Sequence, residues 1–284
     1  MGIKASDVKT LRERTGAGMM DCKKALLEAD GDSEKAERIL KELGLSAADK
    51  RAGRATNEGR VFAKIKDYRG LLLELSCETD FVSRNQEFID LGETIVDRVL
   101  QDDLQDKTDE LESMVKDVAS RIKENMGLRR FDRIQASDDE LLVSYTHGEG
   151  RIGVIVKLKV DDAALKDNEK VGQTAFDLAL HIAAFAPLFL SQKAVDESYV
   201  KEQEELFMKQ VENDPNLQGK PEKVLQSIVK GKLGKHLSTV CLMDQGFVRD
   251  EKQKVSKVLE ALGKEVGGGV DVSGYLYYKV GEEL

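Results

Sequence analysis

The sequence predicts an α+β protein, in which a small three-helix unit precedes two related α+β subdomains with antiparallel sheets. Three observations lead to this fold class. Residues 1–54 have the apolar spacing of short helices, whereas from residue 60 onward the pattern changes to that of strands. A β-hairpin followed by helices then occurs twice, at 61–124 and at 141–185. The length of 284 residues also suffices for more than one hydrophobic core.

The first two helices of the amino-terminal unit are short. We expect the first to be capped by Ser6 and to stop at Gly16, because glycine readily adopts the left-handed conformation that ends helices. The second is expected to run from about residue 19 to residue 29. Its apolar face is made by residues spaced three or four apart: Met19, Cys22, Leu26 and Ala29.

The third helix is expected to be capped by Asp32 or Ser33 and to end before Gly44. The stretch 46–59 is rich in alanine, glycine and charge, and is predicted to be a linker or a frayed helix. Residues 1–54 carry twelve basic and ten acidic side chains, a local charge of +2. This unit is therefore more basic than the chain as a whole.

Residues 55–139 are predicted to form the first α+β subdomain. A turn that ends in Gly70 separates a weakly alternating segment, 61–66, from a nearly continuous apolar segment, 71–75, which indicates a β-hairpin. The remaining elements are two helices and a short extended segment, at about 86–100, 108–124 and 128–134.

Residues 140–284 are predicted to repeat this plan in a second α+β subdomain. Two strands, 141–145 and 152–160, are joined by the glycine-rich turn 147–150, and a helix follows at about 169–185. Near the end of the chain we expect a helix at 254–262 and a closing strand with three tyrosines: Tyr275, Tyr277 and Tyr278.

A helical hairpin is predicted as an insertion in the second subdomain, at about 190–237. All three prolines of the chain lie in this region: Pro187, Pro215 and Pro221. Helical patterns at 198–212 and 222–237 flank the last two prolines, which would form the tip of an antiparallel hairpin. Each arm holds only about two heptads, so an isolated coiled coil of this length would be marginal.

The charge balance restricts the class of partner. The chain has 44 Lys and Arg against 53 Asp and Glu, a net charge of -9. Because neutralising phosphates requires a basic surface, this balance argues against a dedicated nucleic-acid binder and against a polybasic membrane anchor. The longest apolar stretch, 178–190, is too short to cross a bilayer. No direct contact with nucleic acid or membrane is expected.

The cysteines and the amino-terminal sequence indicate a cytoplasmic protein. Cys22, Cys77 and Cys241 are odd in number and far apart, which indicates reduced thiols rather than disulfides or a metal site. The first fifteen residues are charged throughout and lack the apolar region of a secretory signal.

No cofactor or metal is expected. The glycine clusters at 231–235 and 262–264 do not match a phosphate-binding loop, because each lacks the required first glycine and the following hydroxyl. None of the three histidines, His147, His181 and His236, has a metal-ligand spacing to another histidine or to a cysteine. His181 lies among apolar residues and is expected in the core.

Thiol catalysis is the one enzymatic alternative. Cys77 could be a nucleophile with His147 as its base, because the two residues of such a pair must be close in space but not in the sequence. A cysteine at the end of an apolar strand is, however, usually a small buried hydrophobe. We therefore expect a protein that is not an enzyme.

Two segments are candidate binding surfaces. The segment Cys77–Val82 lies between a strand and the next helix, where an apolar side chain such as Phe81 would stand on a connection. From composition alone, burial of Phe81 in the protein's own core is an equal alternative, with Asp80 as a turn former. Met19 and Met20 are adjacent and cannot both face one core from a helix, so at least one is expected at the surface.

Three segments carry a resemblance to a known family. The segment Leu11–Leu26, LRERTGAGMMDCKKAL, resembles the amino-terminal signature of bacterial translation elongation factor Ts, and Cys77–Val82, CETDFV, resembles its second signature. The segment Tyr145–Val154, YTHGEGRIGV, is similar to a third block of the family. The order of these blocks and the total length agree along essentially the whole chain. One departure is Gly246, where family members usually carry proline, and a looser turn is expected there.

This resemblance implies a guanine nucleotide exchange factor for elongation factor Tu. Such a factor binds the GDP-bound GTPase, speeds the release of GDP and leaves when GTP arrives, without chemical catalysis. The resemblance also implies a ubiquitin-associated-like amino-terminal domain, which agrees with the three helices expected in residues 1–54. The two α+β subdomains and the inserted helical hairpin agree as well.

The resemblance also implies roles for individual residues. Thr79, Asp80, Phe81 and Val82 correspond to the element that family members insert beside the Mg²⁺ and phosphate site of the GTPase. Phe81 would be an apolar wedge that moves a helix of the partner, and Asp80 would perturb the polar network of the metal site. A second set of residues would dock on the partner: Arg12, Met19 and Met20 on its nucleotide-binding domain, and His147 on another part.

A non-catalytic adaptor is the alternative from a different class of protein. It would hold a ubiquitin-like or helical ligand with the three-helix unit and another ligand with the hairpin. This interpretation accounts equally well for an acidic chain with few motifs. It does not account for Asp80 and Phe81 on a connection.

Overall fold

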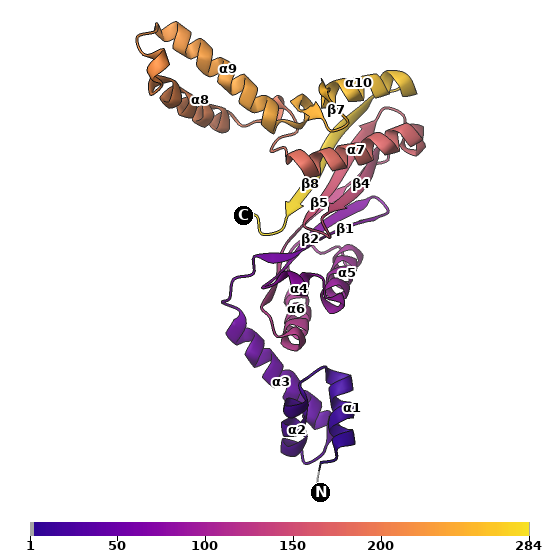
Figure 1. Cartoon of the computed structure of the whole chain (residues 1–284). Helices are drawn as coiled ribbons and strands as arrows, with labels where there is room; N and C mark the ends of the chain where they lie inside the picture. The colour runs from indigo at the N-terminus through magenta and orange to yellow at the C-terminus, as the bar shows by residue number, and fades with distance from the viewer. Residues whose placement is uncertain (1–2, 284) are drawn as a thin grey trace.

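The computed structural model describes residues 3–283. Figure 1 shows an elongated molecule, with three helices at the amino-terminal end and a helical hairpin projecting from the opposite end. Two three-stranded antiparallel sheets lie between them. The predicted α+β fold class is confirmed.

The amino-terminal unit contains α1 (Ala5–Thr15), α2 (Met19–Glu28) and α3 (Ser33–Arg51). Gly16 ends α1 in the left-handed conformation, with a φ of 68°. The carboxylate of Asp32 caps α3 by accepting hydrogen bonds from two amides of its first turn. The small core of this unit takes buried side chains from all three helices: Val8, Leu11, Cys22, Ala25, Leu26, Ala29, Ala36 and Leu40.

The start of α1 differs from the prediction. Ser6 is not its cap, because the helix begins at Ala5 and Lys4 occupies the N-cap position, two residues before Ser6. The carboxylate of Asp7, at the N3 position, accepts the backbone N–H of Lys4 at 3.2 Å and so stabilises this start of the helix.

The third helix also differs, because it continues through Gly44 to Arg51. Gly44 lies where α3 meets α6 (Asp109–Ile122), and a Cβ at this position would lie 3.0 Å from the Cβ of Ser120. The glycine therefore permits a close approach between two helices rather than ending one. The predicted linker 46–59 is helical up to Arg51, and an irregular connection leads from there to the first strand.

The first sheet contains β1 (Glu58–Lys66), β2 (Arg69–Cys77) and β3 (Met126–Gln135), in that order and all antiparallel. One face is covered by α5 (Gln86–Gln101) and α6, and the short helix α4 (Asp80–Ser83) follows β2 directly. The predicted hairpin and both long helices are confirmed. The extended segment expected near 128–134 is a full strand that pairs with β2.

The second sheet contains β4 (Glu140–His147), β5 (Ile152–Val160) and β8 (Val270–Lys279). Its outer face is covered by α7 (Glu169–Phe185) and α10 (Val255–Val266). Both sheets have the same topology, in which the second strand of a hairpin also pairs with a strand that returns after the helices. The described residues 3–283 also contain four short 3-10 segments: Ala163–Asp167, Gln192–Ala194, Pro215–Leu217 and Leu242–Asp244.

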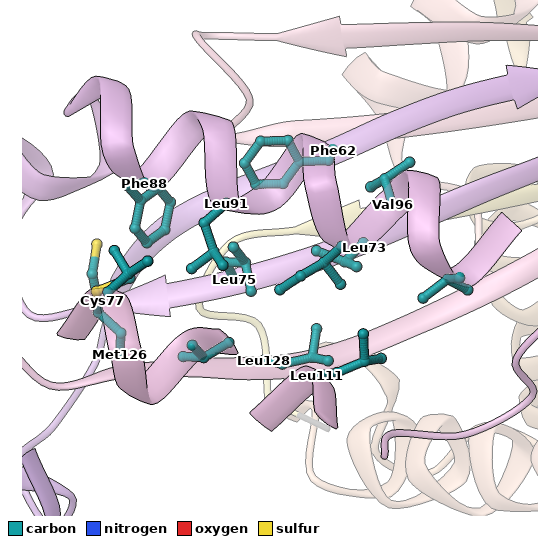
Figure 2. Packing of buried hydrophobic residues seen from close by; sticks show 14 of the residues in the cluster. Phe62, Leu73, Leu75, Cys77, Phe88, Leu91, Val96, Leu111, Met126 and Leu128 are labelled. Atoms are coloured by element: carbon teal, nitrogen blue, oxygen red, sulfur yellow. The ribbon is translucent and has the colours of Figure 1, made fainter. Parts of the chain in front are cut away.

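Alternation along the central strands produces a layered interior. Three leucines of β2 face α5 and α6: Leu71, Leu73 and Leu75. Leu72 faces the other way and meets Ile155 of β5 in a core between the two sheets. Figure 2 shows the core beneath α5, with Cys77, Phe88 and Met126 together at one end. Burial of β2 on both faces explains its nearly continuous apolar sequence.

The helical hairpin consists of α8 (Glu197–Glu212) and α9 (Glu222–Val240), which agree closely with the predicted arms. It projects away from the sheets (Figure 1). Its base is packed by a separate cluster that includes Leu233, Leu237 and Cys241. None of the helices within residues 3–283 is long and apolar enough to span a membrane.

A fully buried glutamate joins the end of the chain to the first sheet. The carboxylate of Glu74, in β2, accepts hydrogen bonds from Arg129 at 3.1 Å, from Arg130 at 2.8 Å and from the amide of Gly281 at 3.0 Å. The Arg130 guanidinium also lies over the ring of Tyr278, 4.0 Å from its centroid. The buried charge is thus paired from three directions, as a charge in an interior requires.

The region of Gly246 differs from the prediction. Gly246 belongs to a two-stranded ribbon of β6 (Gly246–Phe247) and β7 (Asp250–Lys254). A Cβ at this position would lie 2.5 Å from the carbonyl oxygen of Glu251. The glycine therefore allows two backbones to approach closely, and the looser turn that was expected is not observed.

The variant Gly246→Ala is expected to lower the free energy of unfolding by about 1–3 kcal/mol, since the added methyl group forces the backbone of Glu251 to move. Urea denaturation measures this change. Gly231→Ala, in the middle of α9, is the matched control, because nothing lies within 4 Å of the added Cβ. A control variant as unstable as Gly246→Ala would contradict the assignment.

Candidate protein-interaction site

The segment after β2 forms α4, a helix of four residues that presents Phe81 to solvent. Thr79 is its N-cap, and the Thr79 hydroxyl accepts the amide N–H of Val82 at 3.4 Å. Phe81 is 82% exposed, the largest exposed fraction among the large hydrophobic side chains of the described residues. Val82 is buried in the first core. The alternative in which Phe81 packs into the protein's own core is therefore wrong.

Ion pairs link α4 to the second hairpin. The carboxylate of Asp80 lies 3.6 Å from Arg84, whose guanidinium also pairs with Glu149 at 3.0 Å. Glu149 belongs to the turn between β4 and β5. This turn is held on the first sheet by a hydrogen bond from the Val61 amide to the Gly150 carbonyl at 2.7 Å. The β4–β5 turn and α4 therefore lie beside one another.

His147 ends β4 at the start of this same turn. It is exposed, and its Nδ1 atom lies 2.9 Å from the hydroxyl of Tyr145. The Tyr145 ring meets the edge of Phe176 from α7, with 5.8 Å between ring centroids. The structure thus brings His147 to the same edge of the molecule as Asp80 and Phe81, although 66 positions separate His147 from Phe81 in the sequence.

The candidate residues of the amino-terminal unit are also at the surface. Arg12 is exposed, and the exposed fractions of Met19 and Met20 are 44% and 64%. At least one exposed methionine was expected, and this is confirmed. Placing Met19 on the apolar face of α2 was wrong, because it begins the helix and lies outside the small core.

One exposed apolar residue of α2, Leu27, is absent from the residues proposed on sequence grounds. Its side chain is 56% exposed, and it lies seven positions after Met20. Residues seven apart share one face of a helix, so the exposed side chains of Met20 and Leu27 lie on the same face of α2. This spacing is the signal in the sequence that identifies Leu27.

Cys77 is unsuited to catalysis. It is fully buried, and its thiol lies 3.1 Å from the carbonyl oxygen of Thr79 as a hydrogen-bond donor. Burial raises the pKa of the Cys77 thiol to about 12, and the carboxylates of Glu124 and Glu58 act in the same direction. Since the thiolate is the nucleophile, a buried protonated thiol argues strongly against the thiol-enzyme alternative.

Alkylation measures this directly. In the folded protein, Cys77 is expected to react with iodoacetamide at pH 8 at least about 100-fold more slowly than free cysteine, because a pKa near 12 leaves almost no thiolate. The rate should rise only at strongly alkaline pH, or when the protein is unfolded. Rapid labelling of Cys77 near pH 7, detected by peptide mass spectrometry, would restore the alternative.

His181 is a core residue, as expected. It is fully buried, its Nε2 atom lies 2.9 Å from Oε1 of Gln245, and its Nδ1 atom accepts the amide of Val248 at 3.2 Å. Burial lowers the pKa of His181, which favours the neutral imidazole that these two contacts require. Within residues 3–283, no group of three or more His, Cys, Asp or Glu side chains is arranged to hold a metal ion.

An exposed phenylalanine on a one-turn helix and an exposed methionine pair are typical of a protein that acts through a binding surface. Comparison with known proteins points to one family. The family profile described as "Elongation factor TS" matches residues 78–282. The chain is 45% identical to Elongation factor Ts of Treponema denticola over 281 residues, which cover 99% of each chain. It is 44% identical to the protein of that name from Borrelia recurrentis, over 99% of this chain and 100% of the relative. The chain therefore belongs to the elongation factor Ts family and is a translation elongation factor, which acts in protein biosynthesis.

Proposed function

We propose that the protein binds GDP-bound elongation factor Tu and promotes the exchange of GDP for GTP, without catalysing a chemical reaction. The observation that carries this proposal is the exposed side chain of Phe81 on a helix that immediately follows a buried strand. Covering an apolar side chain that is otherwise held in water lowers the free energy of the complex and so favours binding of a partner. The protein acts in the cytoplasm and needs no cofactor.

In this mechanism α4 enters elongation factor Tu beside its Mg²⁺ and phosphate site. Mg²⁺ bridges the phosphates and neutralises their charge, so disturbing its surroundings weakens the binding of GDP. Phe81 displaces a helix of the partner as an apolar wedge. Asp80 supplies a carboxylate to the polar network of the metal site. Its ion pair with Arg84 is solvent-exposed, and such pairs contribute little, so the carboxylate is available to the partner.

The other two residues of the element hold Phe81 and Asp80 in place. Thr79 caps α4 at its start, and Val82 anchors it in the core beneath α5. The element is therefore divided between two side chains that face the partner and two that face the protein itself. Substitutions at Thr79 and Val82 therefore affect nucleotide exchange indirectly, because they change the position of α4.

A second group of residues docks the protein on the same partner. Arg12, Met19 and Met20 present the unit 1–54 to the nucleotide-binding domain, and His147 contacts another part. A large acceleration requires a coupling free energy of several kcal/mol, which is more than one phenylalanine supplies. We assign the α+β subdomains to residues 55–139 and 140–284, with the hairpin inserted at 190–237, and both subdomains contribute to the surface that contains Phe81 and His147.

Reciprocity provides the test. If the protein weakens the binding of GDP to elongation factor Tu, GDP must weaken the binding of the protein by the same factor. The dissociation constant of the complex, measured by titration calorimetry, is expected to rise at least about 100-fold when GDP and Mg²⁺ are present in excess. A dissociation constant that does not depend on GDP would contradict exchange, even if the two proteins bind.

A complex that forms without any response to GDP is also what the adaptor alternative expects. In that case truncation of Phe81 should weaken the complex no more than truncation of any other exposed apolar residue. The adaptor is therefore distinguished from the exchange factor by the nucleotide and not by binding alone.

A further inference from the structure

Phe81 can act on a partner only if α4 is held in place. A helix of four residues has no stability of its own, because helix nucleation is unfavourable and needs several turns to be repaid. The N-cap residue Thr79 is therefore the point at which the rest of the protein can fix this helix. The contacts of Thr79 decide how firmly Phe81 is presented.

Thr79 is held by a glutamate from another part of the chain. One carboxylate oxygen of Glu124 accepts the backbone N–H of Thr79 at 3.1 Å, and the other accepts its hydroxyl at 2.8 Å. Because the hydroxyl hydrogen is given to Glu124, the oxygen of the same hydroxyl is free to accept the amide of Val82. Hydrogen bonds to an ionised carboxylate are stronger than neutral ones. Glu124 therefore fixes both the backbone and the capping group of α4.

The segment that carries Glu124 is itself anchored to the amino-terminal unit. It is the short connection between α6 and β3, whose first residue, Lys123, has a left-handed φ of 68°. Lys123 pairs with Asp21 of α2 at 3.7 Å. The side-chain amide of Asn125 donates to the carbonyl oxygens of Ala52 and Arg54, at 3.2 and 2.7 Å. Three consecutive residues thus contact α2, the cap of α4 and the chain that follows α3.

We propose that Glu124 is a positioning residue for Phe81, and that the connection 123–125 ties the position of α4 to the amino-terminal unit. This inference rests on the proposed exchange function for its purpose, but the geometry on which it depends belongs to the protein alone. Glu124 acts through Thr79, which caps the helix that presents Phe81.

Hydrogen–deuterium exchange of the free, full-length protein tests the positioning. In Glu124→Ala, the amides of residues 79–85 are expected to exchange roughly tenfold faster than in the wild type, since local opening no longer breaks charged hydrogen bonds. Glu124→Gln should be intermediate, because its amide oxygen still accepts one hydrogen bond while its NH2 group opposes a donor. The amides of α7, Glu169–Phe185, should not change.

Glu112→Ala is the matched control. Glu112 is an exposed carboxylate on α6, the same helix that leads to Glu124, and no salt bridge joins it to another of the described residues. This variant should exchange like the wild type over residues 79–85. Unchanged exchange in Glu124→Ala, with the thermal midpoint confirming that the protein is folded, overturns the positioning role.

The kinetics of GDP release separate positioning from docking. At saturating concentrations of Glu124→Ala, the rate constant for GDP release from elongation factor Tu is expected to be roughly tenfold lower than with the wild type. The half-saturating concentration should stay within about twofold, because Arg12, Met19 and Met20 are untouched. A raised half-saturating concentration with an unchanged maximal rate constant overturns the inference. If the wild type itself does not accelerate release, the proposed function fails, and hydrogen exchange still decides the role of Glu124.

Discussion

Phe81→Ala is expected to lower the rate constant for GDP release from the complex with elongation factor Tu by roughly 30-fold. Phe81 is 82% exposed in the free protein, so its truncation removes little from the protein's own core. A central aromatic anchor of an interface typically contributes about 2 kcal/mol or more, and a loss of this size in the transition state for release gives the stated factor. Stopped-flow fluorescence of a labelled GDP measures it.

Two comparisons make this result specific. The free energy of unfolding of Phe81→Ala should stay within about 0.5 kcal/mol of the wild-type value, since an exposed substitution away from structural features has little effect. Tyr68→Ala is the matched control, because Tyr68 is a 51% exposed aromatic residue in the turn at the opposite end of β2. Equal losses of activity in both variants would contradict the assignment of Phe81 as the wedge.

Glu74→Ala is expected to have the largest effect on stability, lowering the free energy of unfolding by about 3 kcal/mol. The substitution removes a fully buried carboxylate that pairs with Arg129, Arg130 and the amide of Gly281. Burial lowers the pKa of Arg130, and hydrogen bonds to Glu74 and Glu282 raise it. Because a guanidinium stays protonated in proteins, the Arg130 cation remains in its partly buried site after Glu74 is removed, without its main partner. Urea denaturation measures the change.

The matched control for Glu74 is Glu260→Ala. Glu260 also pairs with two basic side chains, Lys257 and Lys264, but these ion pairs lie on the exposed face of α10. Exposed pairs of this kind contribute at most about 1 kcal/mol, so the variant should be close to the wild type. Glu74→Ala should also release the last residues of the chain, which hydrogen exchange at Gly281 detects. Equal stability of the two variants would contradict the role given to Glu74.

Much of the secondary structure follows from local pattern. The helix α7 begins and ends at the predicted residues, and both hairpins lie where turn residues interrupt apolar runs. These elements are predictable because a period of 3.6 or 2 is a property of one segment. The exposure of at least one of Met19 and Met20 follows in the same way, since two adjacent helical residues cannot share one buried face.

The errors at two glycines arise where a contact with another segment decides the outcome. Gly44 looked like a helix stop, but it permits α3 to approach Ser120 of α6. Gly246 looked like a loosened turn, but it permits contact between two backbones. The sequence likewise does not reveal that the two sheets pack face to face, because alternation in β2 assigns Leu72 to a second face without saying what covers it.

In the candidate site, too, local pattern predicts only part of the structure, and contacts between segments decide the rest. The motif Cys77–Val82 was predicted as a connection that could bind a partner, and the short helix α4 within it was not predicted. Composition also left the direction of Phe81 open, and the structure places it in solvent. Glu124 was beyond the reach of sequence patterns, since 45 positions separate it from Thr79 and a glutamate at the end of a helix is ordinary. Its role depends on the pairing of β3 with β2, which places Met126 opposite Cys77 and so brings Glu124 close to Thr79.

The most direct test of the central claim is the release of a fluorescent GDP analogue from elongation factor Tu, followed by stopped-flow fluorescence with excess unlabelled GDP and Mg²⁺. Adding the wild-type protein is expected to raise the rate constant for release at least about 100-fold, with saturation as its concentration increases. A rate constant that does not change at any concentration of the protein would contradict the proposed function.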